Sequence, residues 1–357
     1  QTYYLSFRAV DSAGNTSAVA TGDGFQILSC NPGVTNAFGA GDGSLADPFR
    51  ICSLNQWNHF ADTTTSWDKQ IKLESDLNFA GVDYANFKTV GNSTTAFSGT
   101  FDGNNFEIKN ITINAGANNF ALFLNTDGNV NFKNLILKNF TLTSTGTLSG
   151  LIINHGAGGT LSFDTILVQN LTLSKFGGGL VYVSNGDLDA RNITLTNLNI
   201  GGGSTGLFNG VGGIAGIIHK NASIEDVIAD TIVFAANDSN GGIIGTRYLL
   251  AGSGTILFSN IKISNLTINN TMSMNRGGLI GYNPNADITI LNSSVSGTIN
   301  GISGLGGLIG LSGDVTTITT NIDKSSFNGS IIGRSSGGLI GQNFGDLTVN
   351  ESFAIGT

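Results

Sequence analysis

Apolar residues alternate with serine, threonine and asparagine along much of the chain, most clearly over residues 287–299. Related alternations run over residues 224–234, 258–268 and 318–331. A period of two places successive side chains on opposite faces of a strand, so each segment predicts a strand with one buried face. Beyond residue 90 no segment has a clear period of 3.6, and the many asparagine, glycine and β-branched residues disfavour helix. The pattern therefore predicts an all-β protein.

One glycine-led block recurs between these segments. Four near copies, reading Gly-Ile-Ile-Gly or Gly-Leu-Ile-Gly, begin at Gly242, Gly278, Gly307 and Gly338. Weaker copies begin at Ala121, Gly150, Gly179 and Gly213. Successive starts lie 29, 29, 34, 29, 36, 29 and 31 residues apart. A base period of 29 with additions of 2 to 7 residues predicts a solenoid whose extra residues form loops.

Each period holds two or three short strands, which predicts coils of parallel strands stacked at about 4.8 Å. One coil cannot bury its apolar face, but a stack can. Glycine, lacking Cβ, would turn tight corners or let neighbouring walls approach closely, and the Leu-Ile pairs would fill the interior. A β-propeller is the rival architecture, but its blades usually need four clear strands, for which these periods are too short.

The Gly-Gly-Leu-Ile-Gly blocks resemble the GLUG motif repeat of bacterial surface proteins, a group that includes zinc metallopeptidases cleaving immunoglobulin A. Residues 41–49 and 97–104 resemble the stretch that commonly precedes such repeats, so the resemblance covers about residues 38–357. It implies a right-handed parallel β-helix. It implies less about function, because such repeats serve as stalks and binding surfaces in proteins of many activities.

The chain is expected to divide into three parts. Residues 1–28 resemble the final hairpin of an immunoglobulin-like or fibronectin type III module, with a turn near Gly14-Asn15. Residues 29–90 are expected to form a junction and the N-terminal cap of the solenoid, which fills residues 91–357. In the cap, Ser53 and Gln56 fit a capping box for a short helix whose buried face includes Trp57.

Two cysteines, Cys30 and Cys52, lie near this junction with 21 residues between them. We expect a disulfide, mainly because the other features indicate an extracellular protein. A pair of buried thiols is the alternative.

Charged residues are only 11% of the chain, the net charge is −8, and lysine and arginine are scattered singly. Nucleic acid and anionic membranes are therefore not expected as partners. No apolar run reaches the roughly 18 residues that suggest a transmembrane segment. The first residues do not resemble a signal peptide, which predicts a fragment of a longer protein, secreted or displayed on a bacterial surface. No heptads support a trimeric fibre, so oligomeric state stays open.

Catalysis is poorly supported by the sequence. Residues 125–128 (Asn-Thr-Asp-Gly) resemble one polygalacturonase motif and residues 154–156 (Asn-His-Gly) part of another, but the family's paired aspartates and Arg-x-Lys are absent. Asp187 and Asp189 form the one tight acidic couplet of the kind that a lyase would need, and a solvated turn is the simpler reading. The three histidines are too widely separated for a His-Glu-x-x-His zinc site. No cofactor or metal is expected, although calcium at turn aspartates such as Asp42 and Asp47 stays open.

Several Asn-x-Thr sequons recur, beginning for example at Asn110, Asn170, Asn192 and Asn265. They could accept glycans, but their flanking isoleucine and leucine residues favour strand positions with asparagine at a corner of the coil.

A binding surface is expected where the residues just after the glycine blocks stack along one edge. Aromatic rings can stack on sugars, and amide and guanidinium groups can donate directional hydrogen bonds. The residues of this expected ligand-binding column are Tyr182, His219, Arg247, Tyr248, Tyr282, Asn283, Gln342 and Phe344. The sequence thus favours an adhesin that binds a surface glycan or another surface ligand. A passive structural stalk is the first alternative, and a polysaccharide lyase or hydrolase of the β-helix class is the second.

Overall fold

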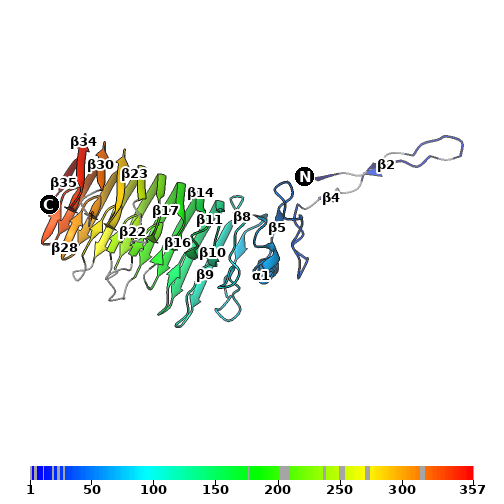
Figure 1. The fold of residues 1–357 in the computed structure, drawn as a ribbon. Coiled ribbons are helices and arrows are strands. Elements are labelled where there is room, and N and C mark those ends of the chain that lie inside the picture. The colour runs from blue at the N-terminus through cyan, green and yellow to red at the C-terminus, as the bar shows by residue number, and fades with distance from the viewer. Residues whose placement is uncertain are drawn as a thin grey trace.

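The computed structural model describes residues 2–3, 6–10, 12–17, 20–21, 25–26, 29–175, 177–201, 210–235, 239–248, 254–269, 274–313 and 318–356. Over these residues the protein is almost entirely β, with parallel strands stacked into an elongated solenoid (Figure 1). Three parallel sheets form its walls. The predicted all-β parallel β-helix is therefore confirmed.

The eight-stranded sheet contributes one short strand from each of eight coils. Its strands, in order, are β10 (Phe123–Thr126), β13 (Ile152–His155), β16 (Val181–Ser184), β19 (Ala215–Ile218), β22 (Ile244–Arg247), β25 (Ile280–Asn283), β29 (Ile309–Ser312) and β33 (Ile340–Asn343). The seven-stranded sheet holds β12 (Leu148–Ser149), β15 (Gly177–Gly178), β18 (Gly210–Gly212), β21 (Ser239–Gly241), β24 (Arg276–Gly277), β28 (Ser303–Gly306) and β32 (Ser335–Gly337).

The sixteen-stranded sheet carries the longest strands, which bend around the solenoid. Its main path, from the C-terminal coil to the N-terminal one, is β34 (Asp346–Asn350), β30 (Thr319–Asp323), β26 (Ala286–Leu291), β23 (Gly254–Asn269), β20 (Ala222–Phe234), β17 (Asp187–Ile200), β14 (Thr160–Leu173), β11 (Val130–Thr143), β8 (Thr100–Asp102), β6 (Gln70–Leu73) and β5 (Phe49–Ile51). Beside this path lie β7 (Leu77–Asn78), β9 (Glu107–Asn114), β27 (Ser294–Asn300), β31 (Ser326–Ile332) and β35 (Phe353–Gly356).

The strand register reproduces the repeat that the glycine blocks predicted. Phe123 pairs with Ile152 and Ile152 with Val181, and the same column continues through Ala215, Ile244, Ile280, Ile309 and Ile340. Neighbouring members of this column differ by 29, 29, 34, 29, 36, 29 and 31 residues, as the block spacing predicts. The column faces inward and is buried through Ile309, so the stack fills its own core.

The glycines of each block have the two roles expected of them. A Cβ on Gly179 or Gly242 would overlap the carbonyl oxygen of the matching glycine in the next coil, Gly213 or Gly278. A Cβ on the preceding glycine, such as Gly241, would overlap the Ile244 carbonyl oxygen of its own coil. The preceding glycine, such as Gly241, therefore turns a tight corner. The glycine after it, such as Gly242, permits close stacking of coils.

The N-terminal end of the solenoid is closed by helix α1 (Leu54–Asp62), followed by a short 3₁₀ helix η1 (Thr64–Ser66). Ser53 caps α1 by accepting from the Gln56 amide at 3.4 Å, as expected. The second half of the predicted capping box is wrong. The buried Gln56 side chain accepts from the Cys52 amide and donates to the Asn31 carbonyl, so it ties the junction to the helix.

The segment assigned to the cap, residues 29–90, already contributes strands β5, β6 and β7 to the sixteen-stranded sheet. At its N-terminal side, β1 (Thr2–Tyr3) pairs antiparallel with β4 (Phe25–Gln26), and β2 (Ser6–Phe7) with β3 (Ala20–Thr21). A bridge between Val10 and Thr16 leads into a turn over residues 12–14. This hairpin extends away from the capped end (Figure 1); its likeness to an immunoglobulin-like module stays a prediction.

The junction is held by a disulfide between Cys30 and Cys52, with Cα atoms 6.2 Å apart. Replacing both cysteines by serine is expected to lower the free energy of unfolding by about 3 kcal/mol, because the crosslink restricts the unfolded chain. Urea unfolding with and without reductant measures this effect. Reductant should shift the wild-type midpoint and leave that of the double variant unchanged; an unshifted wild type would contradict the prediction.

Candidate functional site

Asparagine residues mark one corner of the long strands, where the backbone turns through a positive φ. Asn110, Asn139, Asn170 and Asn197 have φ values of 60°, 59°, 58° and 56°. They occupy equivalent positions in successive coils, because the residues just before them pair in register. Asparagine tolerates this left-handed conformation better than other non-glycine residues. The sequence therefore places asparagine at the corner for a backbone reason.

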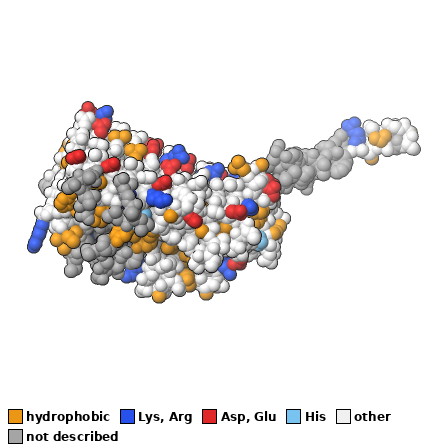
Figure 2. Space-filling model, viewed as in Figure 1, with side chains coloured by type: hydrophobic (Ala, Val, Ile, Leu, Met, Phe, Trp, Pro, Cys, Tyr) orange, Lys and Arg blue, Asp and Glu red, His pale blue; other side chains and the backbone are white. Residues whose placement is uncertain are grey.

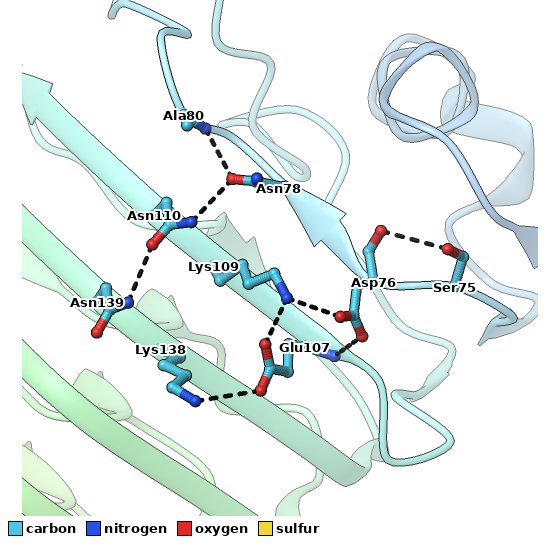
Figure 3. Close-up of polar contacts among 9 residues, drawn as sticks. All are labelled: Ser75, Asp76, Asn78, Ala80, Glu107, Lys109, Asn110, Lys138 and Asn139. Carbon is cyan, nitrogen blue, oxygen red and sulfur yellow. Dashed lines mark hydrogen bonds and ion pairs between the residues drawn. The ribbon is translucent and has the colours of Figure 1, made fainter.

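The amides at this corner form a continuous hydrogen-bonded ladder along the solenoid. The Nδ2 atom of Asn110 donates to Oδ1 of Asn78 at 3.0 Å, and Asn139 donates to Asn110 at 3.0 Å (Figure 3). Asn170 donates to Asn139 at 2.8 Å, and Asn197 donates to Asn170 at 3.0 Å. Each amide of Asn110, Asn139 and Asn170 is thus held at both ends by its neighbours.

A second polar column lies two residues further along each strand and therefore on the same outer face. Thr112, Thr141, Thr172 and Asn199 follow one another in strict register, and Val233 continues the column in the next coil. Together the two columns line a shallow groove of about 510 Å³, which we call the Asn–Thr groove. Its lining residues are Asn110, Thr112, Asn139, Thr141, Asn170, Thr172, Asn197, Leu198, Asn199, Thr231 and Val233.

Among the described residues, no acidic or basic side chain lines the Asn–Thr groove. Beside its N-terminal end, two acids and two bases pair with one another (Figure 3). Lys109 Nζ contacts Asp76 at 2.7 Å and Glu107 at 2.6 Å, and Lys138 contacts Glu107 at 3.3 Å. Hydrogen bonds to the Glu107 amide and to Lys109 lower the pKa of Asp76, and the same lysine lowers that of Glu107. Hydrogen bonds to the two carboxylates raise the pKa of Lys109, so these three shifts all favour the charged forms of Asp76, Glu107 and Lys109.

A second hollow of about 520 Å³ adjoins the groove and shares Thr112 and Thr141 with it. Its wall includes Tyr84, whose side chain remains 36% exposed. The Tyr84 ring packs edge-on against Phe120, with centroids 6.2 Å apart, so the ring is held in place from one side. An exposed ring with a fixed orientation is a suitable stacking platform for a sugar.

The structure separates the expected ligand-binding column into several positions with different environments. Tyr182, Arg247 and Asn283 are buried, with 9%, 2% and 0% exposure, respectively. Arg247 contacts Asn285, and Asn283 donates to the Ala286 carbonyl oxygen at 2.8 Å. Tyr282 and Gln342 are half-buried and stack on Thr246 and Leu311 rather than on other predicted residues. Phe344 is 56% exposed near the C-terminal end.

Two members of that set, His219 and Tyr248, contact each other directly. Their rings meet edge to face at 5.8 Å, and the Nδ1 atom of His219 lies 3.1 Å from the Tyr248 carbonyl oxygen. Burial lowers the pKa of His219, which favours the neutral ring. The pair is a local contact just after the C-terminal ends of β19 and β22, two neighbouring strands in the middle of the eight-stranded sheet.

The fragments that resemble polygalacturonase motifs do lie in adjacent coils, since Asn125 pairs with Asn154 and Thr126 with His155. The His155 ring is entirely buried and lies 2.9 Å from Thr126 Oγ1, and burial lowers its pKa. Asp127 accepts from the Gly158 amide at 3.0 Å. The histidine thus packs inside the wall rather than at the surface.

Across the described residues, no group of three or more histidine, cysteine, aspartate or glutamate side chains is arranged to hold a metal ion. Of the two aspartates considered for calcium, Asp47 pairs with Arg50 at 2.6 Å, and Asp42 accepts from the Ser44 amide at 2.9 Å. Helices in the described part of the chain are all too short or too polar to cross a membrane.

The sequons had indicated asparagine corners, and Asn110, Asn170, Asn192 and Asn265 all have a positive φ. That these asparagines form a ladder along a surface groove was not predicted from the sequence. The spacing could have indicated it, because asparagine recurs at intervals of 29, 31 and 27 residues, close to the coil period, at Asn110, Asn139, Asn170 and Asn197.

Two known proteins show limited similarity to this chain. No family model matches it. A segment of 137 residues, 34% of this chain, is 27% identical to Halomucin of Haloquadratum walsbyi (strain DSM 16790 / HBSQ001), and this similarity spans 2% of Halomucin. Among solved structures, a putative immunoglobulin A1 protease from Bacteroides ovatus matches with a TM-score of 0.45 and 16% identity, over 87% of each chain.

Proposed function

We propose that the chain is a glycan-binding module of a surface-displayed or secreted adhesin. The Asn–Thr groove carries this proposal, because it presents repeated amide and hydroxyl groups on a rigid wall, and its described lining residues are all uncharged. Such groups exchange hydrogen bonds with sugar hydroxyls in both directions. The Cys30–Cys52 disulfide and the partial similarity to Halomucin support an extracellular setting, because disulfides persist in oxidising compartments.

The face of the solenoid seen in Figure 2 offers little for electrostatic binding of a charged polymer. On the face seen in Figure 2, acidic and basic side chains lie interspersed among wide uncharged areas. A charged polymer would therefore meet no broad field of one sign on this face. Affinity on such a surface must come from shape and directional hydrogen bonds.

The first test is binding of the full chain to a broad array of host and bacterial glycans. We expect selective retention of one glycan family and at least tenfold weaker binding after Thr141→Val with Thr172→Val. These changes keep side-chain shape and strand preference but remove two hydroxyl groups, each worth roughly 1 kcal/mol when bonded. Soluble products should be monitored in parallel, because turnover would indicate the hydrolase or lyase alternative.

The matched control is Thr194→Val with Thr196→Val, on the outer face of β17 but outside the groove lining. It should bind as the wild type does. Equal loss in the control pair would remove the groove from the proposal. Silence across the whole array would instead favour a passive spacer or a protein ligand.

A further inference from the structure

The two columns of the Asn–Thr groove repeat once per coil, and this repeat constrains the shape of any ligand. Neighbouring parallel strands are about 4.8 Å apart, so equivalent polar groups recur at that interval along the solenoid. An extended polysaccharide offers its own hydroxyl groups at a similar interval, about one pyranose ring per step. A compact or branched sugar would meet only one or two of these rows.

The side chains in each row also determine how many coils can bind such a polysaccharide. Four coils present an amide at the corner, in the rows Asn110–Thr112, Asn139–Thr141, Asn170–Thr172 and Asn197–Asn199. The next row is Thr231–Val233, which lacks an amide and ends the second column in an apolar side chain. The hydroxyl group at this corner already has a partner in its own coil, because Thr231 donates to Asp230 at 3.1 Å. The polar pattern therefore covers four coils.

The amide ladder prepares these rows for a ligand before it arrives. Each side-chain amide has two N–H donors and an oxygen that can accept twice. In Asn110, Asn139 and Asn170 the ladder uses one donor and one acceptor site, which leaves one of each for a ligand. Little conformational entropy is then lost on binding, because the side chains are already fixed.

The charge of the groove and the adjoining Tyr84 ring further limit the kinds of ligand that can bind. The described residues that line the groove include no cationic side chain to bind a carboxylate. The basic groups beside it already contact acids, Lys109 with Asp76 and Lys138 with Glu107. The neighbouring hollow adds Tyr84, together with one carboxylate, Asp83, which accepts from Asn86 at 2.8 Å. An uncharged sugar next to Thr112 and Thr141 would lie beside the Tyr84 ring.

We propose that the Asn–Thr groove binds an extended, uncharged polysaccharide lying along the solenoid axis, with about one sugar per coil over about four coils, and that Tyr84 stacks on a sugar at its N-terminal end. The inference deepens the proposed function and rests on it. Tyr84 is a positioning and specificity residue that the expected column did not include.

The test measures dissociation constants for uncharged oligosaccharides of two to eight units, using cello-, xylo- and manno-oligosaccharide series, with oligogalacturonides as the charged series. We expect affinity in at least one uncharged series to rise with each unit up to about four and then to stay constant. Oligogalacturonides of equal length should bind at least tenfold more weakly. Affinity independent of length, or stronger binding of the charged series, would overturn the inference.

Tyr84 is tested by substitution on the same oligosaccharides. Tyr84→Phe should keep affinity within about twofold, whereas Tyr84→Ala and Tyr84→Leu should weaken it about tenfold, the cost of one stacked ring. The leucine variant retains apolar packing against Phe120 and guards against loss of folding. Tyr282→Ala, in strand β25 of the eight-stranded sheet and away from the groove lining, is the matched control and should bind as the wild type does. Full affinity in the leucine variant would remove Tyr84 from the site.

The outcomes separate this inference from the proposed function. If a glycan binds and the Thr141→Val with Thr172→Val variant loses it, but neither length nor Tyr84 matters, the function stands and the axial binding mode fails. If no glycan binds at all, the proposed function fails with it.

Discussion

The substitution Gly242→Val is expected to lower the free energy of unfolding by more than about 4 kcal/mol, a loss that single substitutions rarely cause. A Cβ at this position would overlap the Gly278 carbonyl oxygen in the next coil and lie 2.8 Å from Ile263 Cδ1. Backbone hydrogen bonds link these coils, including one from the Gly242 amide to Gly277 at 3.2 Å. The collision therefore cannot relax unless parallel pairing is broken locally.

Urea unfolding followed by far-ultraviolet circular dichroism measures this effect. Gly33→Ala is the control, because its φ lies outside the left-handed region and its nearest contact would be Asn31 Oδ1 at 3.4 Å. That change should stay within about 0.5 kcal/mol of the wild type. A wild-type midpoint for Gly242→Val would refute the view that glycine sets the distance between coils.

Removal of the Trp57 ring is expected to have the second largest effect, about 3–5 kcal/mol for Trp57→Ala. Trp57 is completely buried and joins helix α1 to the first coils, with ring centroids 6.2 Å from Phe101 and 6.1 Å from Phe123. Its Nε1 atom donates to the Lys88 carbonyl oxygen at 2.9 Å. Truncation leaves a cavity and an unpaired carbonyl together.

Because the helix covers one end of the stack, its loss also exposes strand edges that can pair with other chains. Light scattering during mild urea treatment should therefore rise earlier in Trp57→Ala than in the wild type. Asn55→Ala, at an exposed position of the same helix, should change neither stability nor scattering by a measurable amount. Unaltered behaviour of Trp57→Ala would show that the cap is dispensable.

The period and architecture were predictable because they depend on local rules repeated many times. From Gly178-Gly179 onward each coil has glycine at the two crowded positions and aliphatic residues inside, so the sequence repeats where the structure does. The register between Ile244 and Ile280, 36 residues apart, could be predicted despite its insertion because both ends keep the glycine block. The hydrogen bond from the Gln56 side chain could not be predicted, because its partner Asn31 lies 25 residues away in irregular structure.

The expected binding column was less predictable for a geometric reason. It grouped residues that follow the glycine blocks at different offsets, and one residue of offset moves a strand side chain to the opposite face. Arg247 thus points inward, whereas Thr246 shares the column of Tyr282. Tyr84 was missed because it lies in the cap segment and gains its place beside Thr112 only through folding.

Because the asparagine corner recurs in successive coils, duplication or deletion of repeats in the gene can change the number of coils. A duplication or deletion of one whole 29-residue repeat preserves both the inner column and the outer rows, since each coil contacts only its neighbours. Such an event lengthens or shortens the recognition surface by one step and leaves the remaining steps intact. The number of coils would then set the number of sugar-binding rows. Related chains could therefore differ in ligand length and avidity while recognising the same kind of sugar.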